Sequence, residues 1–500
     1  MVMNKIWLSV LLALGLAAGC SRTDIQVKST VGMPQQFDQN AAARGSADIS
    51  RWWQSWPDPV LNELIETGLK NNRNLAKMKA NMLAARASAA MAESDLGPQA
   101  GVESSGGLHR YNGDNSLKDL NLPAIGNAKD YLQASGSPLG NNRQHAHGNT
   151  VQAGFTASWE PDVFGQKRSD ADEMHYLSLS ETERWHGAQM MLGSEITDNY
   201  LKMRAMQQRV KVGEHSVATL KQLQRYTEGR FRAGQVSAYD VKEVAAKLSA
   251  MQAKIATYQA QADVYQRNIA VLTGQPSQGF VVAPASLDIF QHLPSAPAGQ
   301  VPLDIITRRP DIRTQENLVK AMSAGLASAK ADRLPRFSLN FLWQTGQIHL
   351  DSSTSYLKNT AGLLNASMTI PVFTAGRIKH NIERADAQLQ AAIAGYDQMI
   401  LQALAEVDSA YQMQFSLNKQ NRLMHQAQMQ AASQAGAAEK LFRYGDMTLD
   451  RSLRARLNAE DLDDQQIQGK LEEARNLVNL YKALGGGWQI TDRLHDNSNY

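Results

Sequence analysis

The chain contains one long stretch twice, and this repeat constrains the fold more than any other feature. The first copy runs from about Val151 to Gly274 and the second from about Leu363 to Gly486. Residues that match between the copies keep a nearly constant separation: Phe164 with Phe373, Phe231 with Phe442, and Leu272 with Leu484. A repeat this long with so few slips indicates duplication, and therefore two halves of similar structure.

Both copies present the same order of elements. An alternating strand is followed by a turn with basic residues, at 162–168 and at 371–377. A very long helical tract then ends at F-R-A-G-Q-V-S (231–237) or F-R-Y-G-D-M-T (442–448), and a second helix returns from there. The segments before the strands also match, so each half reads helix, strand, loop, strand, long helix, helix.

The Pro-rich stretch between the halves has the composition of a linker. The predicted organisation is a signal peptide, a lipidated N-terminal segment, the first repeat, the linker, the second repeat and a tail: 1–19, 20–59, 60–274, 275–302, 303–486 and 487–500.

The return helices carry the spacing of coiled coils. In 237–272 the apolar residues step by three and four without a break: Val241, Val244, Leu248, Met251, Ile255, Tyr258, Ala262, Tyr265, Ile269 and Leu272. This pattern predicts a coiled-coil seam and not the wider face of a globular helix. The second copy keeps the register but is interrupted by Glu460 and Asp464, within an acidic run that we interpret as a solvated face.

Helix lengths suggest how the elements stack. The tracts 168–231 and 376–441 would each span roughly 95–100 Å as helices. The four shorter predicted helices would span roughly 45–55 Å each; they are 60–96, 237–272, 303–333 and 448–484. Two short helices placed end to end therefore equal one long helix, and a cylinder wall can be built from both kinds.

Four segments alternate between apolar and polar residues, as strands with one apolar face do. They lie near 99–110, 150–161, 335–346 and 363–373. The alternation fits a transmembrane barrel with its apolar face toward lipid, and it fits a soluble two-faced sheet equally well. Four strands cannot close a barrel, whereas three chains would give about twelve.

His145 and His147 form H-x-H in the loop between the first two strands. Two ligands without further partners are too few for a metal site, so we interpret this segment as a solvated loop.

The N-terminus has the features of a bacterial lipoprotein signal. Lys5 precedes an apolar run at 6–18, which is too short for a membrane span. The run ends in L-A-A-G-C (16–20), which resembles a lipobox, so we expect Cys20 to carry acyl chains, including palmitate. Ser21 after the cysteine, by resemblance to such lipoproteins, favours sorting to the outer membrane. Cys20 is the only cysteine, so no intrachain disulfide is possible.

Composition and motifs argue against several function classes. The formal net charge is only +3, and no basic block suggests nucleic acid. The sequence shows no nucleophile–base pattern, HExxH, P-loop or CxxC, so we predict no catalysis and no cofactor besides the covalent lipid.

Several motifs resemble those of the TolC-like outer-membrane efflux family, and most of all its lipidated branch, which serves tripartite drug or metal pumps. They are T-R-R-P-D-I-R (307–313), P-V-F-T-A-G-R (371–377), F-R-x-G at both helix ends, and Y-K-A-L-G-G-G-W (481–488). The resemblance implies an all-α fold of long coiled-coil hairpins forming a periplasmic α-barrel, plus four strands of a trimeric transmembrane β-barrel. It also implies an exit duct for substrates that an inner-membrane pump delivers through a periplasmic adaptor.

Each hairpin turn places a glycine just after a helix, where a left-handed C-cap requires one. Ser237 and Thr448 are expected N-caps of the return helices, and Asp240 gives the first turn nearly a capping box. The glycines are explained by two helical turns alone. The resemblance implies in addition that the adaptor docks here: Gly234, Gln235, Val236, Ser237, Gly445, Asp446, Met447 and Thr448.

The resemblance further implies a duct closed by rings of Leu and Asp early in the last helix. Here Arg454 stands where many relatives have the Asp, and Asp450 lies one turn earlier. A constriction made by Asp450 with Arg451 or Arg454 is one hypothesis, and ordinary surface charge is the other.

The sequence favours a passive efflux duct for small toxic compounds, including antibiotics, over three alternatives. A duct for protein secretion uses the same architecture. A lipid-anchored structural coiled coil leaves the alternating strands unexplained, and a secreted enzyme lacks any catalytic pattern. The sequence does not specify the cargo, or whether the pump is of the resistance-nodulation-division, major facilitator or ABC class.

Overall fold

The computed structural model describes residues 27–37, 43–113, 121–122, 126–127, 144–285, 287–350 and 356–488. The predicted signal peptide and Cys20 lie outside these ranges. The chain divides into two compact units, each made of separate segments of the sequence. The first comprises 1–89, 173–323 and 386–500, and the second comprises 90–172 and 324–385.

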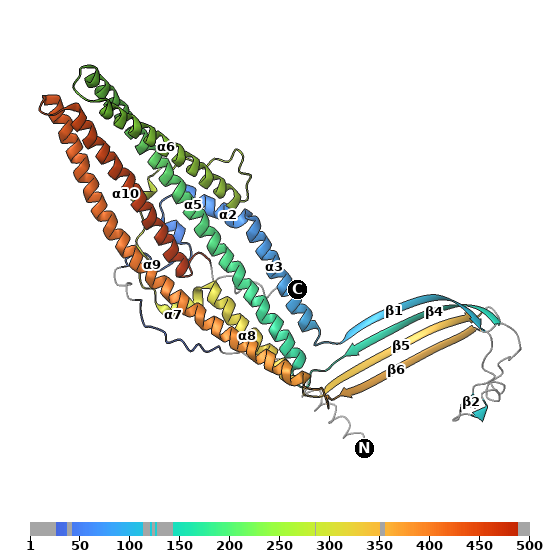
Figure 1. Ribbon diagram of the computed structural model, residues 1–500. Helices are drawn as coiled ribbons and strands as arrows, with labels where there is room; N and C mark the ends of the chain where they lie inside the picture. The colour runs from blue at the N-terminus through green and yellow to red at the C-terminus, as the bar shows by residue number, and fades with distance from the viewer. Residues whose placement is uncertain are drawn as a thin grey trace. The chain divides into compact units, whose positions relative to one another are not determined.

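Long helices build the first unit (Figure 1). The helices of the described residues are α2 (Pro59–Asn71), α3 (Arg73–Ser94), α5 (Gln166–Arg232), α6 (Ala238–Leu272), α7 (Pro302–Arg308), α8 (Pro310–Ala331), α9 (Arg377–Tyr444) and α10 (Leu449–Ala483), with short 3₁₀ turns η2 (Trp52–Ser55) and η4 (Ile289–Gln291). Figure 1 shows α5 beside α6 and α9 beside α10, so each long helix and its return helix form a hairpin. Within the described ranges, no helix combines the length and apolar composition that crossing a bilayer requires.

The coiled-coil seam predicted for α6 is confirmed. Every seam position is buried or half-buried, and Val244 and Ile269 are almost fully enclosed. The three tryptophans before α2, Trp52, Trp53 and Trp56, pack into the core formed with neighbouring helices. Trp56 is fully buried, and the Trp52 ring stacks on that of Tyr481 at 5.2 Å.

Two predicted helices are each broken in two, which corrects the sequence interpretation of 60–96 and 303–333. The first break lies at Asn72, whose backbone is extended. The Asn72 side chain accepts a hydrogen bond from the Leu75 N–H at 2.8 Å and donates one to the Leu272 carbonyl at 2.8 Å. A residue after α6, Gly274, approaches so closely that a Cβ there would lie 2.4 Å from the Asn71 carbonyl oxygen.

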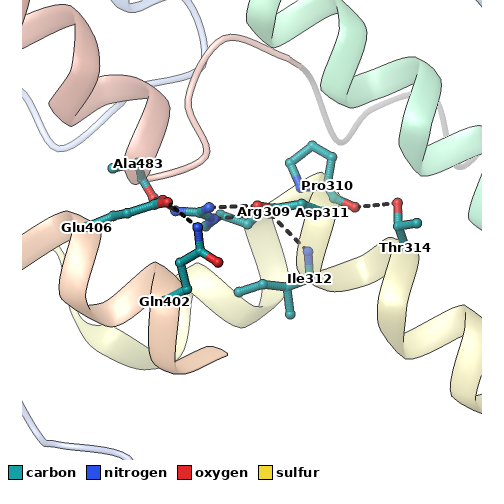
Figure 2. A network of polar contacts seen from close by, with 8 residues as sticks. All are labelled: Arg309, Pro310, Asp311, Ile312, Thr314, Gln402, Glu406 and Ala483. Atoms are coloured by element: carbon teal, nitrogen blue, oxygen red, sulfur yellow. Dashed lines mark hydrogen bonds and ion pairs between the residues drawn. The ribbon is translucent and has the colours of Figure 1, made fainter. Parts of the chain in front are cut away.

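The second break lies at Arg309, the equivalent position in the second repeat. Pro310 disfavours helical backbone in the residue before it, and Arg309 is indeed extended. The buried Arg309 guanidinium donates to the Ala483 carbonyl at 3.0 Å and to the carboxylates of Asp311 and Glu406 (Figure 2). We call the two contact sets at Asn72 and Arg309 the clasps, because each ties the break to the end of the last helix of its own repeat.

The second unit contains a four-stranded antiparallel sheet in the order β1-β4-β5-β6. Its strands are β1 (Gln99–Gly113), β4 (Gln144–Trp159), β5 (Arg336–Leu350) and β6 (Tyr356–Thr369), while β2 (Asn121–Leu122) and β3 (Gly126–Asn127) form a separate pair. The last strand ends earlier than predicted, because Pro371 cannot donate to a ladder and starts the turn.

One face of this sheet is apolar and exposed. Leu364 is 73 % exposed and Val102 is 78 % exposed. Phe155 and Phe341 meet edge-to-face on this face, with ring centroids 6.0 Å apart. The opposite face is polar apart from the paired Leu342 and Leu363, and there Ser338 and Ser367 share a hydrogen bond of 2.6 Å. An exposed apolar face of this size indicates contact with lipid or with another protein surface.

Candidate functional site at the hairpin tips

Both hairpins turn through a glycine in the left-handed region. Gly234 has φ +71° and Gly445 has φ +85°, which confirms the predicted C-caps. The backbone closes each turn as a Schellman motif. The closing bonds run from the Gln235 N–H to the Arg230 carbonyl and from the Asp446 N–H to the Leu441 carbonyl, both at 2.9 Å.

The return helices start differently. Ser237 caps α6 with a complete capping box: its Oγ accepts from the Asp240 N–H at 3.4 Å, and the Asp240 carboxylate accepts from the Ser237 N–H at 2.9 Å. Hydrogen bonds from the Ser237 side chain and backbone lower the pKa of Asp240. Thr448 is the N-cap residue of α10, as predicted, but its side chain makes no capping hydrogen bond.

The residues proposed for docking lie at the surface of both tips. Val236 and Met447 are half-buried, and the other six are exposed. Two tyrosines beside them are also strongly exposed, Tyr239 at 74 % and Tyr444 at 83 %. The tips thus present exposed aromatic and polar groups on a backbone that glycine turns hold in place.

The gate candidates of α10 form a small charged network within one chain. Arg454 donates to Asp450 at 3.1 Å, one turn away, as their spacing predicts. The same guanidinium lies 3.7 Å from Glu243 of α6, so it links the two hairpins. Glu243 also accepts from Lys247, and this bond lowers its pKa. Arg451 is exposed on the same helical turn.

Apolar and ionic contacts join the hairpins a few turns from the tips. Leu223 of α5, Val244 of α6 and Leu453 of α10 form a small buried cluster. Farther along, Arg209 of α5 binds the Asp464 carboxylate with two hydrogen bonds of 2.7 and 2.8 Å, which raise the pKa of Arg209. Three helices therefore meet around a groove of about 460 Å³.

The acidic run on α10 is not a solvated face. Glu460 is 8 % exposed and accepts from the Thr219 hydroxyl at 2.9 Å. Asp464 binds Arg209, and Asp463 accepts from Gln428 of α9 at 2.7 Å. Only Asp461 of the four is exposed. The interrupted apolar seam could have revealed these contacts from the sequence. A carboxylate at a seam position is buried against the facing helix and therefore needs a polar partner there.

Other predicted features lie outside what the structure describes. Cys20 is not among the described residues, and the side chains of His145 and His147 are not described. In the described part of the chain, no three His, Cys, Asp or Glu side chains are grouped as metal ligands would be.

The chain matches known proteins along most of its length. The family model "Outer membrane efflux protein" matches residues 64–275 and 301–486. The pyoverdine export outer membrane protein OpmQ of Pseudomonas aeruginosa is 25% identical over 484 residues, which cover 96% of this chain and 97% of that protein. The toluene efflux pump outer membrane protein TtgC of Pseudomonas putida is 28% identical over 495 residues, covering 97% and 96%.

The fold also matches solved structures. The outer-membrane channel OprN superposes with a TM-score of 0.76 at 25% identity, covering 93% of this chain and 99% of that one. The matched segments include both hairpins with their tips, both clasps and all four strands of the sheet. The chain therefore belongs to the outer membrane efflux protein family, and it is an outer-membrane efflux channel.

Proposed function

We propose that three copies of this chain form the exit duct of a tripartite efflux system. The observation that carries the trimer is the open sheet, whose outer strands β1 and β6 pair only with β4 and β5 in the described part of the chain. A membrane sheet cannot leave its edges unpaired in lipid, and three copies would supply about twelve strands for a closed barrel. A lipid-anchored coiled coil without a barrel would leave the exposed apolar face of the sheet unexplained.

Small toxic compounds, including antibiotics, are the proposed cargo. The named relatives export pyoverdine and toluene, and another is an antibiotic efflux protein of Pseudomonas putida. Deleting the gene in a host that keeps its pump should raise drug susceptibility, and plasmid-borne protein should restore resistance. Unchanged susceptibility to every compound that the pump recognises would reject this assignment.

The proposed docking partner at the tips is a periplasmic adaptor, which would connect the duct to an inner-membrane pump. The support is the exposure of both tips on turns that Schellman motifs close. Photo-crosslinkers at Gln235 and Asp446 should capture the adaptor, whereas one at Met413 on the exposed side of α9 should not. Adaptor capture from Met413 but from neither tip would contradict docking at the tips.

We place the closed gate at Asp450, Arg451 and Arg454, near the second tip. The Asp450–Arg454 pair and the link to Glu243 would resist separation of the hairpins until the adaptor spread them. Replacing both Asp450 and Arg454 by Ala should increase single-channel conductance in planar bilayers, and salt should open the parent because it screens exposed pairs. Unchanged conductance in an assembled double variant would show that other residues form the constriction.

The lipid anchor at Cys20 is the last part of the proposal. The first described residues follow Cys20 in the sequence, and among them Ser29 and Thr30 both donate to the Asp397 carboxylate of α9, at 2.6 and 2.5 Å. This contact would hold the lipidated segment along α9. Cys20→Ser should abolish lipid labelling while the trimer still inserts, and an unmodified Cys20 by mass spectrometry would reject the anchor.

A further inference from the structure

A group of exposed apolar side chains follows the strands at one end of the sheet. Trp159, Arg336 and Thr369 lie at this end, since Trp159 pairs with Leu339 and Arg336 pairs with Thr369. The chain leaves β4 and β6 here through the two repeated turns that contain P-D-V-F-G and P-V-F-T-A-G. We call the exposed apolar residues of these turns the collar: Val163, Phe164, Ile370, Val372 and Phe373.

The collar is unusually exposed for its composition. Val372 is 94 % exposed and Phe373 is 88 % exposed, and in the other repeat Val163 is 62 % exposed. Burying a side chain such as Phe or Val is worth about 1.5–3 kcal/mol, so leaving several of them in water is costly. Both repeats expose the same turn, so the feature is not an accident of one loop.

The collar continues the apolar face of the sheet. The Phe164 ring lies 6.3 Å from that of Phe337, at the start of β5. Phe337 pairs with Met368 of β6, and Ile370 follows directly after the end of this strand at Thr369. The apolar face of the strands therefore reaches the collar through the Phe164–Phe337 contact and through the chain at Ile370.

Basic residues are close to the collar in the sequence, and the acids there already have partners, including Asp162, which accepts from the Arg168 N–H at 2.8 Å. Glu160 binds Lys167 at 3.2 Å, and Asp332 accepts from Gln166, Arg336 and Asn381.

Arg333 and Arg377 are exposed, and within the described residues their guanidinium groups have no carboxylate partner. An arginine with free donors beside an exposed aromatic ring suits a phosphate group at the boundary of an apolar phase.

We infer that the collar is a phospholipid-binding surface at the leaflet on the helical side of the membrane. Phe373 and Val372 enter the acyl-chain boundary, and Arg333 and Arg377 bind headgroup phosphates. The occupant is lipid because the surface is continuous with the lipid-facing side of the sheet and carries a charge complementary to phosphate. The inference rests on insertion of the sheet into the bilayer but not on efflux activity.

The test uses the full-length protein in nanodiscs with a fluorophore on a single introduced cysteine, and the unsubstituted parent shows any background labelling of Cys20. Lipids brominated near the headgroup should quench a label on Phe373→Cys more than lipids brominated near the chain end. The order should reverse for Phe341→Cys, in the middle of the apolar face. Phe415→Cys, on a half-exposed residue of α9, should not be quenched by either lipid.

The outcomes separate the alternatives. Quenching at Phe341→Cys without quenching at Phe373→Cys or Val372→Cys would overturn the inference. Disulfide crosslinking between two copies of the Phe373→Cys variant would then assign the collar to a contact with a neighbouring copy. Absence of quenching at every position would show that the sheet is not inserted, and this would overturn the proposed duct as well.

A second arm tests the headgroup contacts. Arg333→Gln with Arg377→Gln should weaken binding of anionic phosphatidylglycerol, measured by native mass spectrometry, by at least about fivefold. Lys440→Gln, an exposed basic residue near the second tip, should leave it unchanged. Equal lipid binding by the double variant and the parent would show that the two arginines do not bind the headgroups.

Discussion

In both hairpin tips the long helix ends with the same type of turn, but the return helices begin differently. Each turn is a Schellman motif around a left-handed glycine. The first return helix then begins with a reciprocal cap between Ser237 and Asp240. The second begins with Thr448, which makes no capping bond, and Arg451 occupies the position of Asp240.

This difference shows which part of the duplicated unit is constrained by geometry alone. The turn needs a glycine in both copies, whereas the cap can change because it affects only the stability of the first helical turn. A missing N-cap costs about 1 kcal/mol, and a cation near a helix N-terminus is unfavourable besides. We therefore expect the first turn of α10, which carries Asp450, to open more easily than that of α6. Arg454, which makes the link to Glu243, lies one turn farther along α10.

The largest expected effect comes from breaking the contact that couples the hairpins. Asp464→Ala leaves the Arg209 guanidinium half-buried without its carboxylate, which should cost about 2–3 kcal/mol. Hydrogen exchange should then speed up in the α10 segment that packs on α5, while the first tip keeps its protection. Asp461→Ala, at the exposed neighbour, should change exchange very little. Equal effects of the two substitutions would mean that Asp464 does not couple the hairpins.

Removing the cap hydroxyls compares the tips directly. Ser237→Ala should lower the opening free energy of the first turn of α6 by about 1 kcal/mol. Thr448→Ala should leave the first turn of α10 nearly unchanged, because no capping bond is lost. Both values are accessible by hydrogen exchange of the peptides that follow each tip. A similar loss of opening free energy at both tips would show that Thr448 caps α10 as Ser237 caps α6.

A capping box can be completed at the second tip. Arg451→Glu places a carboxylate at the third helical position after Thr448 and removes a cation from the helix start. It should stabilise the first turn of α10 by about 0.5–1 kcal/mol. Arg451→Ala is the matched control, since it removes the charge without adding the acceptor. If both variants gain equally, the cation and not the missing cap explains the difference.

The smallest effect is a pH dependence confined to the first tip. Hydrogen bonds from the Ser237 side chain and backbone lower the pKa of Asp240 in the folded tip. Because the folded pKa is the lower one, the capping contribution is complete above the unfolded pKa and declines as pH falls through the folded value. Protection of the α6 start, corrected for intrinsic exchange, should be flat near neutrality and fall below about pH 4. A decline that begins near neutrality would point to another group.

Sequence reasoning found the features that local pattern determines. The alternation of the strands, the three-and-four spacing on α6 and the glycines of the tips each depend on neighbouring residues. It failed where the deciding partner is distant in sequence. Asp464 meets Arg209 across 255 positions, and Asn72 meets the Leu272 carbonyl across 200. For the tips, the sequence identified the turns and the cap of α6, and adaptor docking there stays a prediction.

The clasps have a consequence for the order in which the chain folds. Each joins the beginning of a repeat to its end, Asn72 to Leu272 and Arg309 to Ala483. Contacts of such high sequence separation form slowly, because a long loop must close before they stabilise anything. Both partners of the first clasp precede the second repeat, so the first half can close on itself while the second is still being exported. Secretion intermediates that end after Gly274 should therefore already protect the Asn72 region from protease, and those that end before α6 should not.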